Sequence, residues 1–213
     1  MKAEFLASGP EDAAAGLLLA HGAGAPMDSP FMDGMAERLG KRGIRVLRFE
    51  FPYMLARRAG QRKPPPRADK LVDVYGAVLD YAREDTGTMP LFIGGKSMGG
   101  RVAAMLSGTR DDIPGVVCLG YPFHPPGNPD ALRLDPLNAA RASVLVCQGD
   151  RDPFGKREEV EGYDIADHVR FVWSDDGDHD LKPRGRAAAT WTSNLDAAAD
   201  AASAFMLGEG PQP

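Results

Sequence analysis

Ser97 is the residue of this sequence that is most clearly placed to do chemistry. It is the centre of the pentapeptide Gly95-Lys96-Ser97-Met98-Gly99, which follows a short apolar run and precedes a pattern of helical spacing. A reactive serine on a sharp turn between a strand and a helix needs glycine two positions before and after it, because β-carbons there would collide. The pattern therefore indicates Ser97 as a catalytic nucleophile.

The same letters contain Gly95-Lys96-Ser97, which is also how a phosphate-binding P-loop ends. That loop requires another glycine five positions before Gly95, where this sequence has Pro90. The residues between them are typical of a strand and not of a glycine-rich cradle. A nucleotide-binding site is therefore not predicted.

A serine hydroxyl is a weak nucleophile at neutral pH, so it needs a histidine to accept its proton and a carboxylate to orient that histidine. His179 and Asp152 are the predicted partners, because each follows a predicted strand and the order serine, aspartate, histidine is that of hydrolases built on a parallel sheet. Asp150 lies in the same loop and is the alternative acid. Asp152 is preferred because Pro153 holds it in an extended or turn conformation, whereas Asp150 is expected to bond backbone amides.

Acyl transfer also needs hydrogen-bond donors for the oxyanion of the tetrahedral intermediate, and losing one donor typically costs about 2.7–4 kcal/mol of barrier height. The backbone N–H of Met98 is one expected donor. The second is expected just after the first parallel strand, where Ala23 is preferred and Gly22 and Gly24 are the alternatives. His21 is expected to shape this loop and not to act as a base.

These residues must be positioned by a parallel sheet, because the chain alternates short apolar runs with longer helical patterns. Ligands of such sheets bind where the strands end. The predicted strands are 16–20, 44–49, 91–93, 115–119, 143–148 and 169–173, with a short antiparallel edge strand at 1–6. The predicted helices are 31–42, 68–83, 98–107, 129–140, 156–162 and 186–206. We expect a three-layer α/β/α sandwich with a mostly parallel sheet of six to seven strands, in one domain over 1–207 with a flexible tail at 208–213.

Composition narrows the class of protein. The 213 residues allow one good core, and 43% apolar and 26% charged residues are typical of a compact globular protein. The net charge of −5 disfavours nucleic acid as a partner, and no run approaches the roughly 20 apolar residues of a membrane span or forms a signal-peptide core. Cys118 and Cys147 are expected to be buried apolar residues, so neither a disulfide nor a metal site is predicted. We therefore expect a cytoplasmic protein that needs no cofactor.

The segments 19–25, 48–53 and 120–127, taken with the serine pentapeptide, carry a family resemblance. Over nearly all of residues 16–207 the chain resembles the small α/β-hydrolases of the dienelactone-hydrolase-like kind. The three segments are most similar to predicted hydrolases related to the testis-expressed and NSL-complex hydrolase-like proteins. The resemblance implies a hydrolase without fixing its substrate, and dienelactone hydrolase itself uses cysteine where this chain has Ser97.

The triad and the resemblance together predict a serine hydrolase that cleaves a small carboxylic ester or thioester through an acyl-enzyme intermediate. The alternative is a noncatalytic binding or scaffold protein that keeps the fold. An oxidoreductase on a nucleotide-binding sheet is disfavoured, because the phosphate-binding fingerprint is missing.

The segment 57–67 is basic although the chain as a whole is acidic. It starts at the end of the sheet where ligands bind, so Arg57, Arg58 or Arg62 is a candidate for attracting an anionic group of the substrate. The alternative is a solvated loop stiffened by proline.

Tyr53, Phe123 and His124 are candidates for the wall of the substrate pocket, although aromatic residues in such loops also complete the core. The span 121–142 is the only one near the usual position of a cap domain, and it is short and begins with many prolines and glycines. A large lid cannot fit there, so we expect an open, shallow site suited to small substrates.

Overall fold

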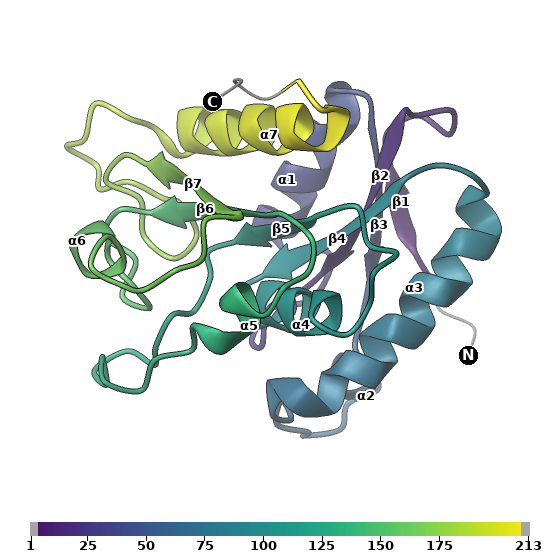
Figure 1. Cartoon of the computed structure of the whole chain (residues 1–213), viewed down its shortest axis with the longest axis horizontal. Helices are drawn as coiled ribbons and strands as arrows, with labels where there is room; N and C mark the ends of the chain where they lie inside the picture. The colour runs from purple at the N-terminus through teal and green to yellow at the C-terminus, as the bar shows by residue number, and fades with distance from the viewer. Residues whose placement is uncertain (1–3, 210–213) are drawn as a thin grey trace.

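The centre of the fold is a seven-stranded sheet in the order β1-β3-β2-β4-β5-β6-β7. The computed structural model describes residues 4–209. The strands are β1 Leu6–Ser8, β2 Ala15–Ala20, β3 Ile44–Phe49, β4 Leu91–Lys96, β5 Val116–Leu119, β6 Val144–Gly149 and β7 Val169–Ser174. β1 pairs antiparallel with β3, and the other pairs are parallel (Figure 1). The predicted mostly parallel sheet is confirmed.

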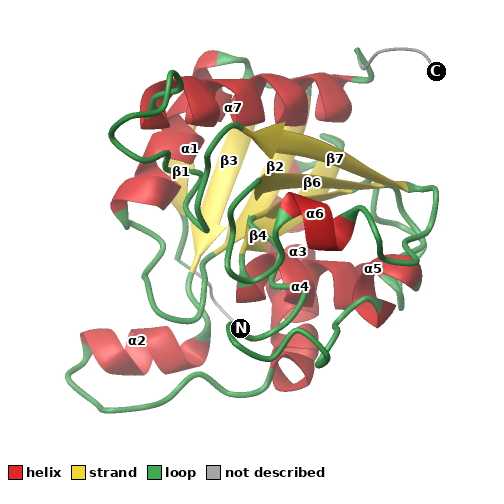
Figure 2. Cartoon of the chain, turned by 90° about the vertical axis from the view of Figure 1, so that its left-hand side faces the viewer, coloured by secondary structure: helices red, strands yellow, loops and turns green. Residues whose placement is uncertain are grey.

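Helices cover both faces of this sheet, which gives the predicted three layers (Figure 1 and Figure 2). One face is covered by α1 and α7, and the other by α3 and α4. The long helices are α1 Pro30–Lys41, α3 Val72–Thr86, α4 Met98–Ser107 and α7 Trp191–Leu207. The short ones are α2 Pro52–Arg58, the 3-10 turn η1 Ala68–Leu71, α5 Asp135–Asn138 and α6 Arg157–Val160.

The side chains of β2 point alternately to the two faces of the sheet, and this fixes the sheet between the two helical layers. Leu17 and Leu19 pack into the core beneath α1 and α7, whereas Leu18 and Ala20 pack into the core beneath α3 and α4. Each fully buried leucine side chain contributes about 1.5–3 kcal/mol relative to an exposed one. The end of β2 is therefore held firmly in place.

The order in which successive strands are added to the sheet changes direction at β2, which has β3 on one side and β4 on the other. In open sheets of this kind, the crevice for ligands lies at such a point, outside the carboxyl ends of the strands. The loops after β2 and β4 contain the predicted oxyanion donors and the predicted nucleophile. The topology thus brings these two loops together.

Several predicted elements differ from the structure in length. The edge strand predicted at 1–6 is found at Leu6–Ser8, and residues 1–3 lie outside the described part of the chain. The helix predicted at 129–140 is only Asp135–Asn138, because the prolines and glycines before it favour turns. Of the predicted tail at 208–213, Gly208 ends α7 in a left-handed conformation, and residues 210–213 lie outside the described part.

Helix α2 was not predicted, and it changes the interpretation of the basic segment 57–67. Pro52 stands in its first turn, where the missing N–H is not needed and the fixed φ suits a helix. Arg57 and Arg58 end this helix, so they do not belong to a free loop.

The span 121–142 contains loops and the four-residue helix α5, as expected for a fold without a large lid. Within residues 4–209, none of the helices is long and apolar enough to cross a membrane.

Candidate active site

Ser97 is the single residue between β4 and α4, and its backbone has the strained φ of 53° and ψ of −115°. A β-carbon at Gly95 would lie 2.4 Å from the carbonyl carbon of Gly99, and one at Gly99 would lie 2.6 Å from the carbonyl oxygen of Ala20. The Ser97 N–H donates to the carbonyl oxygen of Leu119 on the neighbouring strand, at 3.0 Å. The glycines therefore allow the tight turn that presents the Ser97 side chain beyond the sheet.

Asp152 contacts His179 directly. Its Oδ2 atom lies 2.8 Å from His179 Nδ1, and its carboxylate is completely buried. Oδ2 also accepts a hydrogen bond from Gln148 Nε2 at 2.9 Å, and Oδ1 accepts one from the backbone N–H of Phe154 at 2.8 Å. Both carboxylate oxygens thus have donors, which fix the orientation of the carboxylate toward the imidazole.

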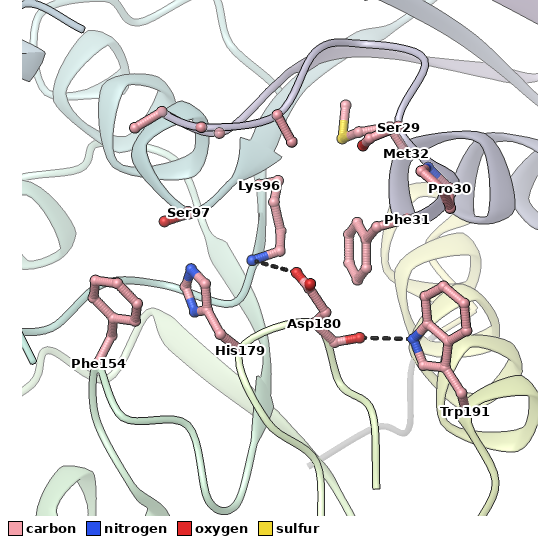
Figure 3. A pocket seen from close by; sticks show the side chains of 14 residues that line it. Ser29, Pro30, Phe31, Met32, Lys96, Ser97, Phe154, His179, Asp180 and Trp191 are labelled. Atoms are coloured by element: carbon pink, nitrogen blue, oxygen red, sulfur yellow. Dashed lines mark hydrogen bonds and ion pairs between the residues drawn. The ribbon is translucent and has the colours of Figure 1, made fainter. Parts of the chain in front are cut away.

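Packing fixes the position of the His179 ring. The ring of Phe154 lies against it, with 4.2 Å between centroids. Gly120, with a φ of +65°, lies so close that a β-carbon there would be 2.7 Å from the His179 carbonyl oxygen. Figure 3 shows the Ser97 and His179 side chains next to each other at the same cavity.

Asp150, the alternative acid, points elsewhere. Its Oδ2 accepts a hydrogen bond from the backbone N–H of Asp176 at 3.0 Å, as predicted for a residue that bonds backbone amides. Of the two candidate acids, Asp152 is the one that hydrogen-bonds His179.

Ala23, Ser97 and Met98 line one hollow. Met98 is the first residue of α4, where a backbone N–H has no acceptor within the helix. Within residues 4–209, no backbone hydrogen bond uses the N–H of Ala23 or of Met98. These two donors are therefore available to an oxyanion formed at Ser97.

His21 shapes the loop after β2, as predicted. Its Nδ1 lies 2.6 Å from the carbonyl oxygen of Gly22, and its Nε2 accepts a hydrogen bond from the backbone N–H of Phe51 at 3.1 Å. These bonds require the neutral tautomer that carries its proton on Nδ1. Burial lowers the pKa of His21, which favours the same neutral form.

Two cavities, each of about 460 Å³, meet at Ser97. The first also contains His179 and Lys96, and its walls include the apolar side chains of Phe31, Phe154 and Trp191 (Figure 3). We call it the histidine-side cavity.

The second cavity shares Ala23, Ser97 and Phe154 with the first and extends past Met98. Its far wall contains three arginines and one aspartate, which are Arg67, Arg101, Arg133 and Asp69. We call it the arginine-side cavity.

Lys96 has no role assigned from the sequence. In the structure it connects the turn at Ser97 to the loop that contains His179. Its Nζ lies 3.3 Å from Asp180 Oδ1 and 5.3 Å from the centre of the Phe31 ring (Figure 3). Burial lowers the pKa of Lys96, and the nearby carboxylate of Asp180 opposes that shift. Trp191 Nε1 donates to the Asp180 carbonyl oxygen at 2.8 Å, so this loop is also held from α7.

The aromatic pocket candidates line neither cavity. The Tyr53 hydroxyl donates to the Gly22 carbonyl oxygen at 3.1 Å and so supports the loop after β2. Phe123 is fully buried in the core, and His124 is buried with Nδ1 2.9 Å from the Pro125 carbonyl oxygen. Phe123 therefore completes the hydrophobic core and does not form a wall of either cavity.

The basic candidates are also outside both cavities. Arg57 Nε donates to the Lys63 carbonyl oxygen at 2.7 Å. Arg58 forms ion pairs with Glu50 at 2.7 Å and Asp28 at 2.6 Å, so its charge is already neutralised. The arginines that line a cavity together with Ser97 are Arg67, Arg101 and Arg133.

Sequence reasoning missed Gln148, Phe154, Arg101 and Arg133. The third arginine of the second cavity, Arg67, ends the basic segment 57–67 that the sequence singled out. Gln148 had a usable signal, because it is a polar residue at the end of a buried apolar strand. Phe154, Arg101 and Arg133 come from three separate segments, and nothing in their local sequence indicates a shared wall.

Within the described part of the chain, no cluster of three or more His, Cys, Asp and Glu side chains is placed to hold a metal ion. Cys118 and Cys147 are buried, as predicted, and both are free thiols in the structure.

Known proteins resemble this chain along almost its whole length. Est1E from Butyrivibrio proteoclasticus has a TM-score of 0.70 and 16% identity, with 97% of this chain and 98% of that one covered. Dienelactone hydrolase from Anabaena variabilis has a TM-score of 0.70 and 21% identity, with 98% and 92% covered. An α/β serine hydrolase without lid from Xanthomonas campestris has a TM-score of 0.67 and 17% identity, with 100% and 97% covered.

At these identities the likeness to solved structures shows the fold. The family model described as alpha/beta hydrolase domain matches residues 13–207. Because this match covers most of the sequence, the chain belongs to the alpha/beta hydrolase family.

Proposed function

We propose that this protein is a serine hydrolase that cleaves a small carboxylic ester or thioester through an acyl-enzyme intermediate. Ser97 is the nucleophile, His179 is the general base and then the general acid, and Asp152 orients His179. The hydrogen bond of 2.8 Å between Asp152 and His179, at a cavity shared with Ser97, is the observation that carries the proposal.

In the first half of the reaction, Ser97 Oγ attacks the carbonyl carbon of the substrate while His179 Nε2 takes the hydroxyl proton. The oxyanion that forms accepts hydrogen bonds from the backbone N–H groups of Ala23 and Met98. The buried carboxylate of Asp152 stabilises the imidazolium. His179 then gives the proton to the leaving oxygen or sulfur, and the acyl group stays on Ser97.

In the second half, His179 takes a proton from water, which attacks the acyl carbon. A second oxyanion forms at the same two N–H groups, and its collapse releases the carboxylic acid and returns the proton to Ser97. No step requires a metal ion or a cofactor.

The two cavities divide the substrate between them. The leaving group lies in the histidine-side cavity, because His179 must protonate its oxygen or sulfur. The acyl group then extends into the arginine-side cavity, past Met98. Each volume suits a small organic group.

We also propose the cytoplasm as its location, which fits two free, buried cysteines. The motifs at 19–25, 48–53 and 120–127 support a relation to the testis-expressed and NSL-complex hydrolase-like proteins within the family.

A panel of soluble esters and thioesters, read by stopped-flow release of the leaving group, tests the proposal. We expect turnover by the wild type, and an initial burst for esters with good leaving groups if deacylation is slow. Ser97→Ala should remove both. Turnover by Ser97→Ala equal to that of the wild type contradicts the proposal, and a folded wild type without turnover or serine labelling supports the noncatalytic alternative.

A further inference from the structure

The arginine-side cavity carries positive charge that the chain itself leaves unbalanced. Of its three arginines, Arg67 donates to Asp69 at 3.1 Å. Among residues 4–209, no carboxylate lies within ion-pair distance of the Arg101 or Arg133 side chain. The Nε of Arg101 is buried and has no hydrogen-bond partner.

Among the residues that the structure describes, only one long contact holds the guanidinium group of Arg133. Its Nη1 reaches the carbonyl oxygen of Pro122 at 3.5 Å, the outer limit for a hydrogen bond. Burial, followed by the positive charge of Arg101, lowers the pKa of Arg133. Two guanidinium groups that are partly buried and repel each other are unfavourable unless an anion joins them.

The location of this pair relative to Ser97 indicates which part of a substrate it would contact. Arg101 begins the second turn of α4, one turn after the nucleophile, and Met98 lies between them. Both arginines line the cavity that excludes His179. A group bound there belongs to the acyl half of the substrate, because the leaving group must remain beside His179.

Resting on the proposed serine hydrolase function, we propose that Arg101 and Arg133 bind a carboxylate at the far end of the acyl group. The preferred substrates are then half-esters or half-thioesters of small dicarboxylic acids. The planar guanidinium fork matches a carboxylate with two parallel N–H donors. Water and the half-ester give the dicarboxylic acid and the free alcohol, so the reaction balances without another reactant.

Paired substrates test this proposal in kinetics. The mono-para-nitrophenyl ester of adipic acid carries the distal carboxylate, and the mixed methyl para-nitrophenyl adipate is its neutral match. The measured quantity is the ratio of kcat/KM for the charged ester to that for the neutral ester. We expect this ratio to fall roughly 10- to 100-fold in Arg101→Met, as for the loss of a hydrogen bond to a charged group.

Arg170→Met is the matched control, because Arg170 is exposed on β7 and lines neither cavity. It removes the same charge and should change the ratio less than about twofold. Arg101→Lys should restore part of the ratio, because the charge returns without the planar fork. If Arg101→Met does not fold, Arg133→Met is measured in its place. If neither Arg101→Met nor Arg133→Met lowers the ratio below its wild-type value, the proposal is overturned.

A binding measurement separates failure of this inference from failure of the proposed function. Adipate should raise the Tm of Ser97→Ala, and the added Arg101→Met change should abolish the shift. If the wild type hydrolyses the neutral ester but adipate produces no shift, the carboxylate site is wrong and the hydrolase stands. If adipate binds through Arg101 but the wild type hydrolyses neither ester, the carboxylate site stands and the hydrolase is wrong.

Discussion

The buried carboxylate of Asp152 lies 2.8 Å from Nδ1 of His179, across 27 residues of sequence. Because a carboxylate accepts hydrogen bonds, the contact places the histidine proton on Nδ1 and leaves Nε2 as an acceptor. That tautomer is the one in which a histidine can take the proton of a serine.

Asp152→Asn should lower kcat by about 10⁴-fold, because an amide favours the wrong histidine tautomer. Asp150→Asn is the matched control, since Asp150 bonds the backbone of Asp176 and not His179. It should lower kcat less than about tenfold while lowering the free energy of unfolding by about 1 kcal/mol. Steady-state kinetics on folded variants checks both, and equal losses of kcat would contradict the assignment of the acid.

Gly95→Ala should destabilise the protein strongly, because the new β-carbon would lie 2.4 Å from backbone. We expect the free energy of unfolding to fall by at least about 1–3 kcal/mol, as in overpacked cores. Gly24→Ala is the control, since a β-carbon there meets no atom within 4 Å. Denaturant unfolding of the two variants measures the difference, and similar stabilities would show that the turn is not tight.

The free energy of unfolding should decrease as the pH falls below about 6.5. Burial lowers the pKa of His21 from its ordinary value of 6.5, so the unfolded chain binds a proton there before the folded one does. The contribution of neutral His21 to the free energy of unfolding is complete above about pH 6.5. It is lost as the pH falls from there through the lowered pKa, with a slope of up to about 1.4 kcal/mol per pH unit.

Urea unfolding between about pH 7 and about pH 5 measures this slope. His21→Gln should make it shallower, and His168→Gln is the control because His168 lies at a partly exposed position. An unchanged slope in His21→Gln would assign the acid sensitivity to other groups.

The absence of a large lid over 121–142 predicts a preference for short, soluble esters. Rates on a series of para-nitrophenyl esters should fall as the acyl chain lengthens, without a jump at the concentration where substrate forms micelles. Preference for emulsified long-chain lipids would contradict this expectation.

The catalytic candidates were predictable because each carries a local signal. Ser97 has its glycines, and Asp152 and His179 follow apolar strands in the order that a hydrolase requires. The parallel sheet was predictable for the same reason, since buried strands form continuous runs of Val, Ile and Leu. Helix α2, which begins with Pro52, was not predicted at all.

The residues that line the two cavities were not predictable, because side chains from distant segments build the cavity walls. Phe123 follows a strand in the same way as Phe154, yet Phe123 is buried in the core and Phe154 packs on His179. Arg58 lies in a conspicuously basic segment, but Glu50 and Asp28 neutralise it. Only the folded chain shows that Arg101 and Arg133 line the same cavity as Ser97.

Covalent labelling with a fluorophosphonate, followed by peptide mapping, tests whether Ser97 is an activated nucleophile. We expect a single adduct on Ser97, which is absent from Ser97→Ala and forms far more slowly in His179→Ala. A folded wild-type protein that forms no adduct, or one that is labelled at a different serine, would contradict it.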